Sequence, residues 1–290
     1  MLVKMIRARS DANDSIMYAQ HVFAELDFLV HKHVRQRLGS VLEIGPGVNL
    51  GVLFCFVACG VERAAGVDIE RISELRPAFY ETLRHYLTCV EGVRWWRYFT
   101  AKPFPHVSFP PCLATPIAEE LLQRIDYRHP VSCASLPFED NSFELVYSVS
   151  ALEHVPEPDQ TIGEIRRVLR DGGMSIQELG LQHHGAADPL RFLEWSDEEY
   201  AAKAQPYGDG KSLQGLLDGT WQGEVFCNRL RLSDWLDLFQ RYGFAILEIE
   251  RTVLLDQCAV RPERFVEPFR SKPIDDLAVL GFRIVAQCCK

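Results

Sequence analysis

Long apolar runs are missing from this sequence. No stretch approaches the ~18 consecutive apolar residues from which a membrane-spanning helix is built. The first residues, MLVKMIRARSDANDS, contain no apolar segment of signal-peptide length. The nine cysteines are dispersed and form no CxxC pair, the usual spacing of redox and zinc motifs. We therefore expect a cytoplasmic protein with reduced thiols and no membrane insertion.

An excess of positive charge is also missing. Lys and Arg total 31 whereas Asp and Glu total 40, which gives a formal net charge of −9. Proteins that hold nucleic acids usually carry a basic surface that displaces counterions from phosphates. We therefore expect no nucleic acid among the partners and favour a small-molecule acceptor, while homo-oligomer formation is left open.

The hydrophobic pattern indicates a globular α/β protein. Repeats and low-complexity tracts are absent, and 47% of the 290 residues are hydrophobic. Short apolar strands alternate with helical patterns, which predicts a doubly wound parallel sheet with ligands beyond the carboxyl ends of its strands. The expected strands are 41–44, 64–68, 143–149, 174–178, 245–250 and 277–287, and the main expected helices are 14–37, 50–59, 71–88 and 158–170.

One helix precedes this alternation, and two segments interrupt it. We expect residues 1–38 to form an N-terminal helical cap and residues 39–287 to form the main domain. Its insertions lie at about 75–130, with a short helix at 117–125, and at about 180–230. The aromatic residues of the insertions either wall a substrate pocket or form the core of the caps, and both interpretations are open. These residues are Trp95, Trp96, Tyr98, Phe99, Trp195, Tyr200 and Trp221.

The most informative local pattern is a glycine turn after the first strand. Gly45 and Gly47 allow a tight turn and a close approach of the backbone to a ligand. The next glycine, Gly51, is one position too late for the GxGxxG fingerprint of nicotinamide enzymes. Glu43 lies under the turn and Asp68 closes the second strand, where two carboxylate oxygens can accept both hydroxyls of a ribose. The alternative is that both carboxylates only cap loops or helix ends.

Five sequence blocks resemble the class I S-adenosylmethionine (SAM)-dependent methyltransferases, in the broad subgroup that acts on small molecules. The blocks occur in the family's order: Glu43–Gly47 (EIGPG), Gly66–Asp68 (GVD), Leu136–Val146 (LPFEDNSFELV), Leu152–Val155 (LEHV) and Gly172–Gly173. The resemblance covers about residues 39–180, and residues 231–287 fit the family's last two strands. It implies a Rossmann-like, seven-stranded, mostly parallel sheet whose last strand is antiparallel.

The resemblance also implies a cofactor site for SAM. Its members are Glu43 at the ammonium, Gly45, Pro46 and Gly47 in the loop around the methionine part, Asp68 at the ribose, Ile69 on the adenine, and Ser132 and Cys133 along the adenine edge. Two positions depart from the family. Ser132 stands where an acidic residue is common, and Asn49 replaces the third glycine of the loop, although asparagine tolerates a positive φ.

The function implied by the resemblance is methyl transfer from SAM to an O or N atom of a small molecule, such as a metabolite, a natural product or a glycan sugar. Two alternatives from other classes are weighed against it. The first is a regulatory or partner protein that has the SAM fold and does not transfer methyl groups. The second is a nicotinamide oxidoreductase, which the glycine spacing disfavours.

Three histidines are candidate catalytic residues. His154 follows the fourth strand, and His183 and His184 follow the fifth, where a neutral imidazole can take a proton from an acceptor hydroxyl. His183, His184 and Asp188 also resemble a set of metal ligands. Adjacent histidines do not easily point at one ion, so we expect no metal there. Ordinary loop histidines are the remaining interpretation.

Overall fold

The computed structural model describes residues 12–34, 37–71, 77–88, 117–184, 186–205, 224–254 and 256–290. Five of the aromatic residues discussed above lie outside these ranges, namely Trp95, Trp96, Tyr98, Phe99 and Trp221. None of the helices in the described ranges combines the length and the apolar content that crossing a membrane requires.

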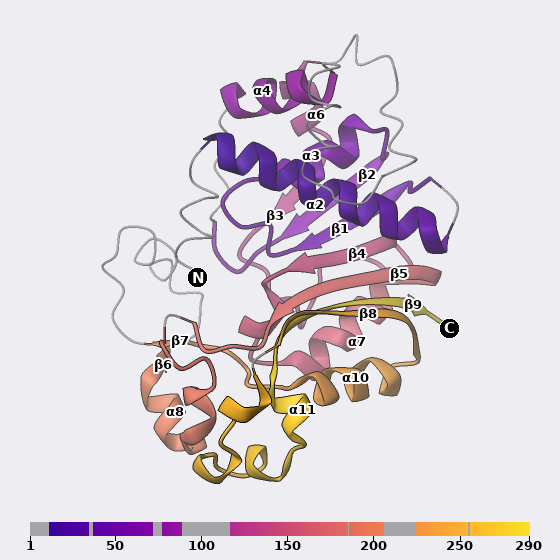
Figure 1. Ribbon diagram of the computed structural model, residues 1–290. Coiled ribbons are helices and arrows are strands. Elements are labelled where there is room, and N and C mark those ends of the chain that lie inside the picture. The colour runs from indigo at the N-terminus through magenta and orange to yellow at the C-terminus, as the bar shows by residue number, and fades with distance from the viewer. Residues whose placement is uncertain are drawn as a thin grey trace.

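A mixed seven-stranded sheet runs through the described part of the chain, in the order β3-β2-β1-β4-β5-β9-β8 (Figure 1). Neighbouring strands from β3 to β5 are parallel, and β9 is antiparallel to both β5 and β8. This confirms the expected doubly wound, Rossmann-like sheet with an antiparallel last strand. The strands are β1 (Ser40–Ile44), β2 (Arg63–Val67), β3 (Ile125–Arg128), β4 (Phe143–Val149), β5 (Leu169–Gly180), β8 (Phe244–Leu254) and β9 (Val279–Cys288).

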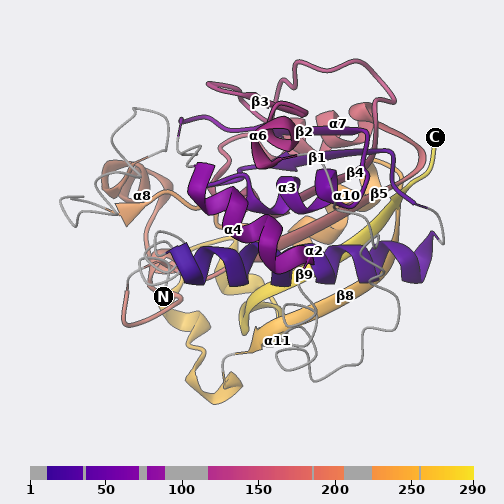
Figure 2. The same cartoon turned by 90° about the horizontal axis from the view of Figure 1, so that it is seen from above.

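Helices cover both faces of this sheet (Figures 1 and 2). One face carries α2 (Ala12–His33), α3 (Gly51–Ala58), α4 (Pro77–Thr88) and α6 (Ala118–Leu122), and the other carries α7 (Pro158–Val168) and α10 (Leu232–Arg241). Every residue of α3 is buried, because its sequence GVLFCFVA has no polar side chain and α2 packs over it. On the opposite face, Trp235 of α10 and Ile162 of α7 are fully buried.

The carboxyl ends of four parallel strands meet at one edge of the sheet. Ile44 pairs in register with Val67 and with Ser148, and Val149 pairs with Glu178. The residues that follow these strands are therefore neighbours in space although they are far apart in the sequence. They comprise the glycine turn after β1, Asp68 after β2, and the short helix η1 (Leu152–His154) after β4.

A smaller lobe lies beyond this edge, at the lower left of Figure 1. It contains η2 (Arg191–Glu194), α8 (Asp197–Lys203), α11 (Ile274–Leu277), and a two-stranded sheet of β6 (Ala204–Gln205) and β7 (Glu224–Val225). Its core joins Phe192 and Tyr200 to Phe265 and Leu277. The lobe is thus built from the second insertion together with the segment between β8 and β9. The sequence pattern did not connect these two segments.

The expectation for the end of the first insertion was wrong. Residues 117–125 were expected to be helical and the insertion to extend to about 130, whereas α6 ends at Leu122 and β3 is an edge strand of the main sheet. Only Ile125 among the four residues of β3 is buried. A short edge strand with one buried side chain has no alternation that a sequence pattern could detect.

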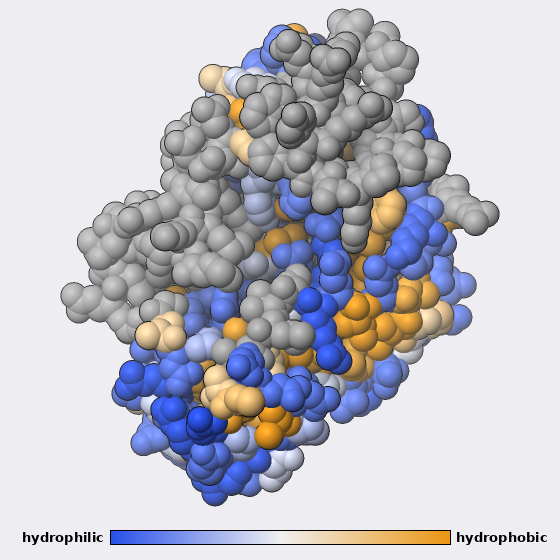
Figure 3. Space-filling view, in the orientation of Figure 1, coloured by the Kyte–Doolittle hydropathy of each residue, from blue (hydrophilic) through white to orange (hydrophobic). Residues whose placement is uncertain are grey.

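The opposite edge strand, β8, exposes apolar side chains. Leu247 and Ile249 are each 38% exposed, and Figure 3 shows apolar residues gathered over this part of the sheet. The C-terminal end of α2 reaches β8 through an ion pair of 2.5 Å between Lys32 Nζ and Glu248 Oε2. The N-terminal helix therefore packs on α3 and also contacts the far edge of the sheet.

Candidate active site

The glycine turn packs directly against the segment that follows β4. Gly45 and Gly47 have φ values of +70° and +74°, a backbone region that favours glycine. A Cβ atom on Gly45 would lie 2.7 Å from the Cβ atom of Ala151, so a larger residue cannot occupy this position without a shift of the backbone. Ala151 immediately precedes η1, which ends at His154. The turn therefore packs against the segment that leads to the first histidine.

Asp68 is a buried carboxylate beside this turn. Its side chain is 8% exposed, and Oδ1 accepts a hydrogen bond of 3.2 Å from the Glu70 backbone N–H. Among the described residues, Oδ2 is buried and has no hydrogen-bond partner. Burial raises the pKa of Asp68 to about 7, although backbone N–H groups, including that of Gly47, lower it. A buried acceptor without a donor costs free energy unless a ligand supplies one.

The residues expected along the adenine lie next to Asp68. Ile69 is 39% exposed and presents an apolar surface at this edge. The Val131 N–H donates to the Asp68 backbone oxygen at 2.8 Å, which brings the segment with Ser132 and Cys133 beside Asp68. Ser132 is exposed, and its Oγ accepts a hydrogen bond from the Ala134 N–H. The Cys133 thiol is directed toward α7, where it lies 3.4 Å from Thr161 Oγ1.

Glu43 lies in β1 beneath the turn. It is buried and pairs in register with Tyr147 of β4. Burial raises the pKa of the Tyr147 hydroxyl, and the carboxylate of Glu43 raises it further. The proximity of Tyr147 and Cys55 places the carboxylate on the face of the sheet that α3 covers.

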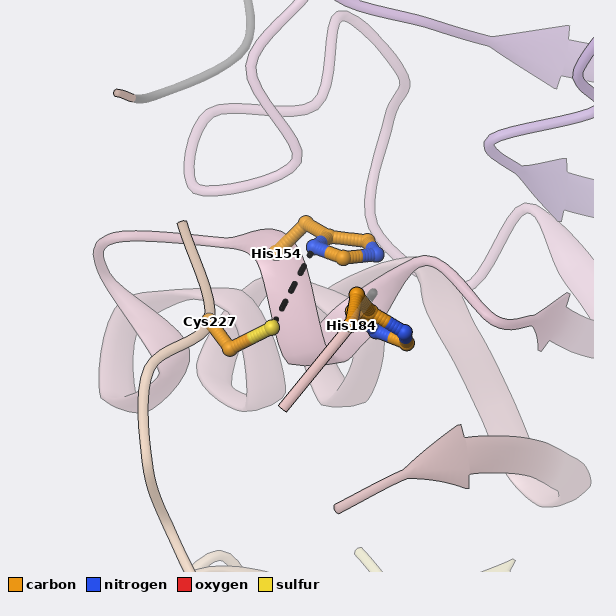
Figure 4. A group of neighbouring side chains, drawn as sticks. All are labelled: His154, His184 and Cys227. Carbon is orange, nitrogen blue, oxygen red and sulfur yellow. Dashed lines mark hydrogen bonds between the residues drawn. The ribbon is translucent and has the colours of Figure 1, made fainter. Parts of the chain in front are cut away.

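Two of the three candidate histidines face each other. The rings of His154 and His184 have centroids 5.0 Å apart (Figure 4). His154 Nδ1 donates a hydrogen bond of 2.7 Å to the backbone oxygen of Phe226, which leaves the lone pair on Nε2. Burial lowers the pKa of His154 to about 4 and the pKa of His184 well below its usual value. Both rings are therefore neutral at pH 7.

His183 points elsewhere. Its Nε2 lies 2.8 Å from Glu224 Oε2, and its ring stacks on Phe192 with an interplanar angle of 13°. Adjacent histidines thus take different directions, as the sequence analysis argued. Asp188 forms an ion pair of 3.6 Å with Arg264 and is not a member of the group formed by His154, His184 and Cys227.

The segment 226–229 closes the site from the smaller lobe. From their place ahead of the last helix, Asn228 and Arg229 are predicted to face the pocket, whereas nothing in the sequence singles out Phe226 or Cys227. Cys227 Sγ lies 3.8 Å from His154 Nδ1. The side chain of Asn228 donates to the Leu152 backbone oxygen at 2.8 Å, which attaches this segment to η1. No motif surrounds Cys227 that could have identified it.

The aromatic residues of the second insertion that the structure describes form the core of the lobe. Tyr200 is buried, and its hydroxyl accepts from the Cys227 N–H and donates to the Cys227 backbone oxygen. Trp195 packs on Tyr200 and on His183. For these two residues the structure favours a structural role over a pocket wall.

Comparison with known proteins adds independent information. A family model described as a methyltransferase domain matches residues 114–176, which contain the LPF and LEHV blocks. This match covers part of the chain and agrees with the sheet order and with the glycine turn beside Asp68. Over this segment the chain is similar to methyltransferase domains, which agrees with its resemblance to the class I SAM-dependent methyltransferases.

The curated relatives match over short segments. A sterol 4-C-methyltransferase from Caenorhabditis elegans is 41% identical over 44 residues, which are 15% of this chain and 13% of the relative. A sterol 24-C-methyltransferase from Schizosaccharomyces pombe is 49% identical over 39 residues, 13% of this chain and 10% of the relative. The matches therefore span only a small part of the length of either relative.

Solved structures match over most of the chain at low identity. A putative sarcosine dimethylglycine methyltransferase from Galdieria sulphuraria is 15% identical, with a TM-score of 0.47 and coverage of 96% of this chain and 87% of the other. A putative SAM-dependent methyltransferase from Listeria monocytogenes is 10% identical, with a TM-score of 0.45 and coverage of 93% and 100%.

Proposed function

We propose that this protein transfers a methyl group from SAM to an O or N atom of a small molecule. The observation that carries the proposal is the buried, unpartnered Oδ2 of Asp68 beside the glycine turn. Through Ala151, the same turn contacts the segment that bears His154. A cofactor-binding half and an acceptor-binding half therefore adjoin at the carboxyl edge of the sheet.

The residues at this edge fit the functional groups of SAM. Asp68 accepts hydrogen bonds from the ribose hydroxyls, because its Oδ2 is a buried acceptor in need of a donor. Gly45, Pro46 and Gly47 form the loop around the methionine part, with the carboxylate of Glu43 beneath it for the ammonium group. Ile69 offers an apolar contact for the adenine, and the segment with Ser132 and Cys133 lines the adenine edge.

The chain's own residues contribute orientation and a dry environment. When bound, SAM supplies an electrophilic methyl group on a positively charged sulfur. His154 and His184 present neutral, buried rings beside the turn, and their lone pairs can hold an acceptor hydroxyl or amine in line with the methyl group. His183 positions its loop through Glu224. Segment 226–229 covers these rings and excludes water.

The acceptor class can be tested with a panel of probes. Incubation with labelled SAM and a catechol, a primary amine or a sterol is expected to label the catechol or the amine. Labelling of the sterol at a carbon atom would contradict the O or N acceptor atom and favour the carbon chemistry that the names of the curated relatives state. Binding of SAM without any methyl transfer would favour the regulatory alternative.

Replacing His154 with alanine should lower kcat for the labelled acceptor by at least about a hundredfold, because the acceptor loses one of the groups that orient it. The affinity for SAM should remain within about twofold, since His154 lies on the acceptor side of the turn. The matched control is His21→Ala, because His21 lies on α2 and its side chain is 53% exposed. Equal activities of the two variants would remove His154 from the acceptor site.

The affinity for SAM should depend on pH through Asp68. Its pKa of about 7 lies above the ordinary value of 3.8, so the carboxyl is protonated below pH 7 in the cofactor-free protein. The ribose hydroxyls favour the carboxylate, so binding must release this proton. The affinity is therefore expected to fall by about tenfold for each pH unit below 7. Calorimetric titration between pH 5.5 and 7 measures this dependence, and Asp68→Asn should flatten it.

A further inference from the structure

Three potential metal ligands from distant parts of the chain meet at the acceptor side of the site. His154 ends η1, His184 follows β5, and Cys227 follows β7 (Figure 4). One ligand atom from each residue can be chosen so that all three lie within 4.8 Å of one another. Their separation in the sequence explains why no metal motif is visible there.

The backbone around these side chains is held independently of any ligand. The hydroxyl of Tyr200 bonds to both the backbone N–H and the backbone oxygen of Cys227, at 2.7 and 2.8 Å. The Asn228 N–H donates to the Glu153 backbone oxygen at 2.8 Å, and its side chain donates to the Leu152 oxygen. The backbone of Cys227 is therefore fixed near η1 by bonds that do not involve its thiol, which lies 3.8 Å from His154 Nδ1.

His184 supplies an independent indication of a ligand. Its Nε2 is buried and makes no hydrogen bond within the ranges that the structure describes. Since a neutral imidazole carries one nitrogen lone pair and one N–H, a buried ring without any partner for Nε2 is costly. A metal ion that accepts this lone pair would remove the cost.

The chemistry of the three donors indicates the ion. Two imidazoles and one thiolate are nitrogen and sulfur ligands, which favour Zn²⁺ over Mg²⁺ or Ca²⁺. Ligands of tetrahedral zinc at about 2.0–2.3 Å from the metal lie roughly 3.3–3.6 Å from one another. The three candidate ligand atoms lie within 4.8 Å of one another, so closure of the triangle needs shifts of about 1 Å.

A buried carboxylate supports the charge balance of such a site. Glu153 is 2% exposed, and its Oε1 lies 4.0 Å from His154 Nε2 and accepts a hydrogen bond from the Gly180 N–H. A Cβ atom on Gly180 would lie 3.3 Å from this oxygen and 3.5 Å from His184 Cε1, so the carboxylate borders both rings. One thiolate and this carboxylate together would neutralise a divalent ion.

We propose that His154, His184 and Cys227 bind one Zn²⁺ ion and leave a fourth position open. Three protein ligands with an open position are the usual arrangement of catalytic zinc. The sequence offered only His183 and Asp188 as fellow ligands of His184, and we expected no metal from that set. In the structure the side chains near His184 are instead those of His154 and Cys227. At the open position the ion, in place of direct contacts from the two rings, would hold a hydroxyl or amine of the acceptor, and this use rests on the function proposed above.

The test is zinc binding by the full chain after treatment with a chelator. We expect one Zn²⁺ per chain by elemental analysis, with Co²⁺ in its place showing the absorption of a tetrahedral site with a thiolate ligand. Cys227→Ala and His184→Ala should each weaken zinc binding by more than about a hundredfold, since even residues behind the ligands contribute ten- to a hundredfold. Competition with a chromophoric chelator measures this loss.

Two matched variants serve as controls. Cys258→Ala removes an exposed cysteine, and His21→Ala removes an exposed histidine on α2. Both should bind zinc like the unaltered chain, and circular dichroism should show that all four variants are folded. Substoichiometric zinc in the unaltered chain, or equal affinity in all variants, would overturn the proposal.

The test of zinc binding and the test of the proposed methyl transfer can fail independently of each other. SAM binding is measured on the zinc-free chain, and zinc binding is measured without SAM. Zinc binding without methyl transfer would retain the metal site and reject the methyltransferase activity. Methyl transfer by a chain that binds no zinc would retain the methyltransferase activity and reject the metal site.

Discussion

Replacing Asp68 with alanine is expected to weaken the binding of SAM by about ten- to a hundredfold. The change removes a buried carboxylate whose Oδ2 has no other hydrogen-bond partner among the described residues. Loss of a hydrogen bond to a charged group costs about 1.5–3 kcal/mol, which corresponds to this range of affinity. Calorimetric titration with SAM and with its demethylated product measures the effect, and micromolar binding of both is expected for the unaltered chain.

Two controls make this result specific to the cofactor site. Glu62→Gln removes an exposed carboxylate just before the opposite end of β2 and should leave the affinity for SAM unchanged. NAD should not bind, because the glycine spacing does not fit a nicotinamide site. If Asp68→Ala binds SAM as tightly as Glu62→Gln does, Asp68 is not the ribose ligand. Binding of NAD instead of SAM would reject the cofactor assignment itself.

Replacing Arg231 with leucine should lower the free energy of unfolding by about 3 kcal/mol, the cost of leaving buried carbonyl groups without donors. Arg231 is fully buried at the start of α10. Its guanidinium donates hydrogen bonds to the backbone oxygens of Leu181, Leu277 and Val279. Burial lowers its pKa to about 10, so the side chain remains charged at pH 7. Urea denaturation followed by circular dichroism measures the loss.

The position of Arg231 also connects stability to the site. Leu181 begins the loop that carries His183 and His184, and Leu277 ends α11 in the smaller lobe. Arg231 therefore holds the loop, the lobe and β9 together. The control is Arg241→Leu on the same helix, where the side chain is 62% exposed and pairs with Asp159. The Arg241→Leu substitution should lower the free energy of unfolding by less than about 1 kcal/mol. Similar losses for both variants would contradict the role of Arg231.

Much of the fold could be predicted because its main strands are buried on both faces. Strands such as β1 and β4 are mostly buried and rich in apolar residues, and the turn Gly45–Gly47 ends β1. Edge strands lack this signal, which is why β3 was missed. The lobe was only partly foreseen, because its core joins Phe192 to Phe265 across more than seventy residues.

The features of the site that could be predicted are local in the sequence, and those that could not depend on packing between distant segments. The glycine turn and Asp68 are local features, since their positions follow from where β1 and β2 end in a parallel sheet. The orientation of the histidines is not local. His183 turns toward Glu224 and His184 toward His154 because segments 224–229 and 152–154 pack on either side of their loop.

By itself, the sequence determined the α/β class, the strand ends at which a ligand is expected, and the resemblance to the class I methyltransferases. Periodicity and turn residues act within a few positions, so they specify elements and the residues at their ends. The tertiary structure alone decided that Cys227 joins His154 and His184, and that Asp68 retains a buried oxygen in need of a donor. Such groupings depend on long-range packing, which brings residues from separate elements within a few ångströms of one another.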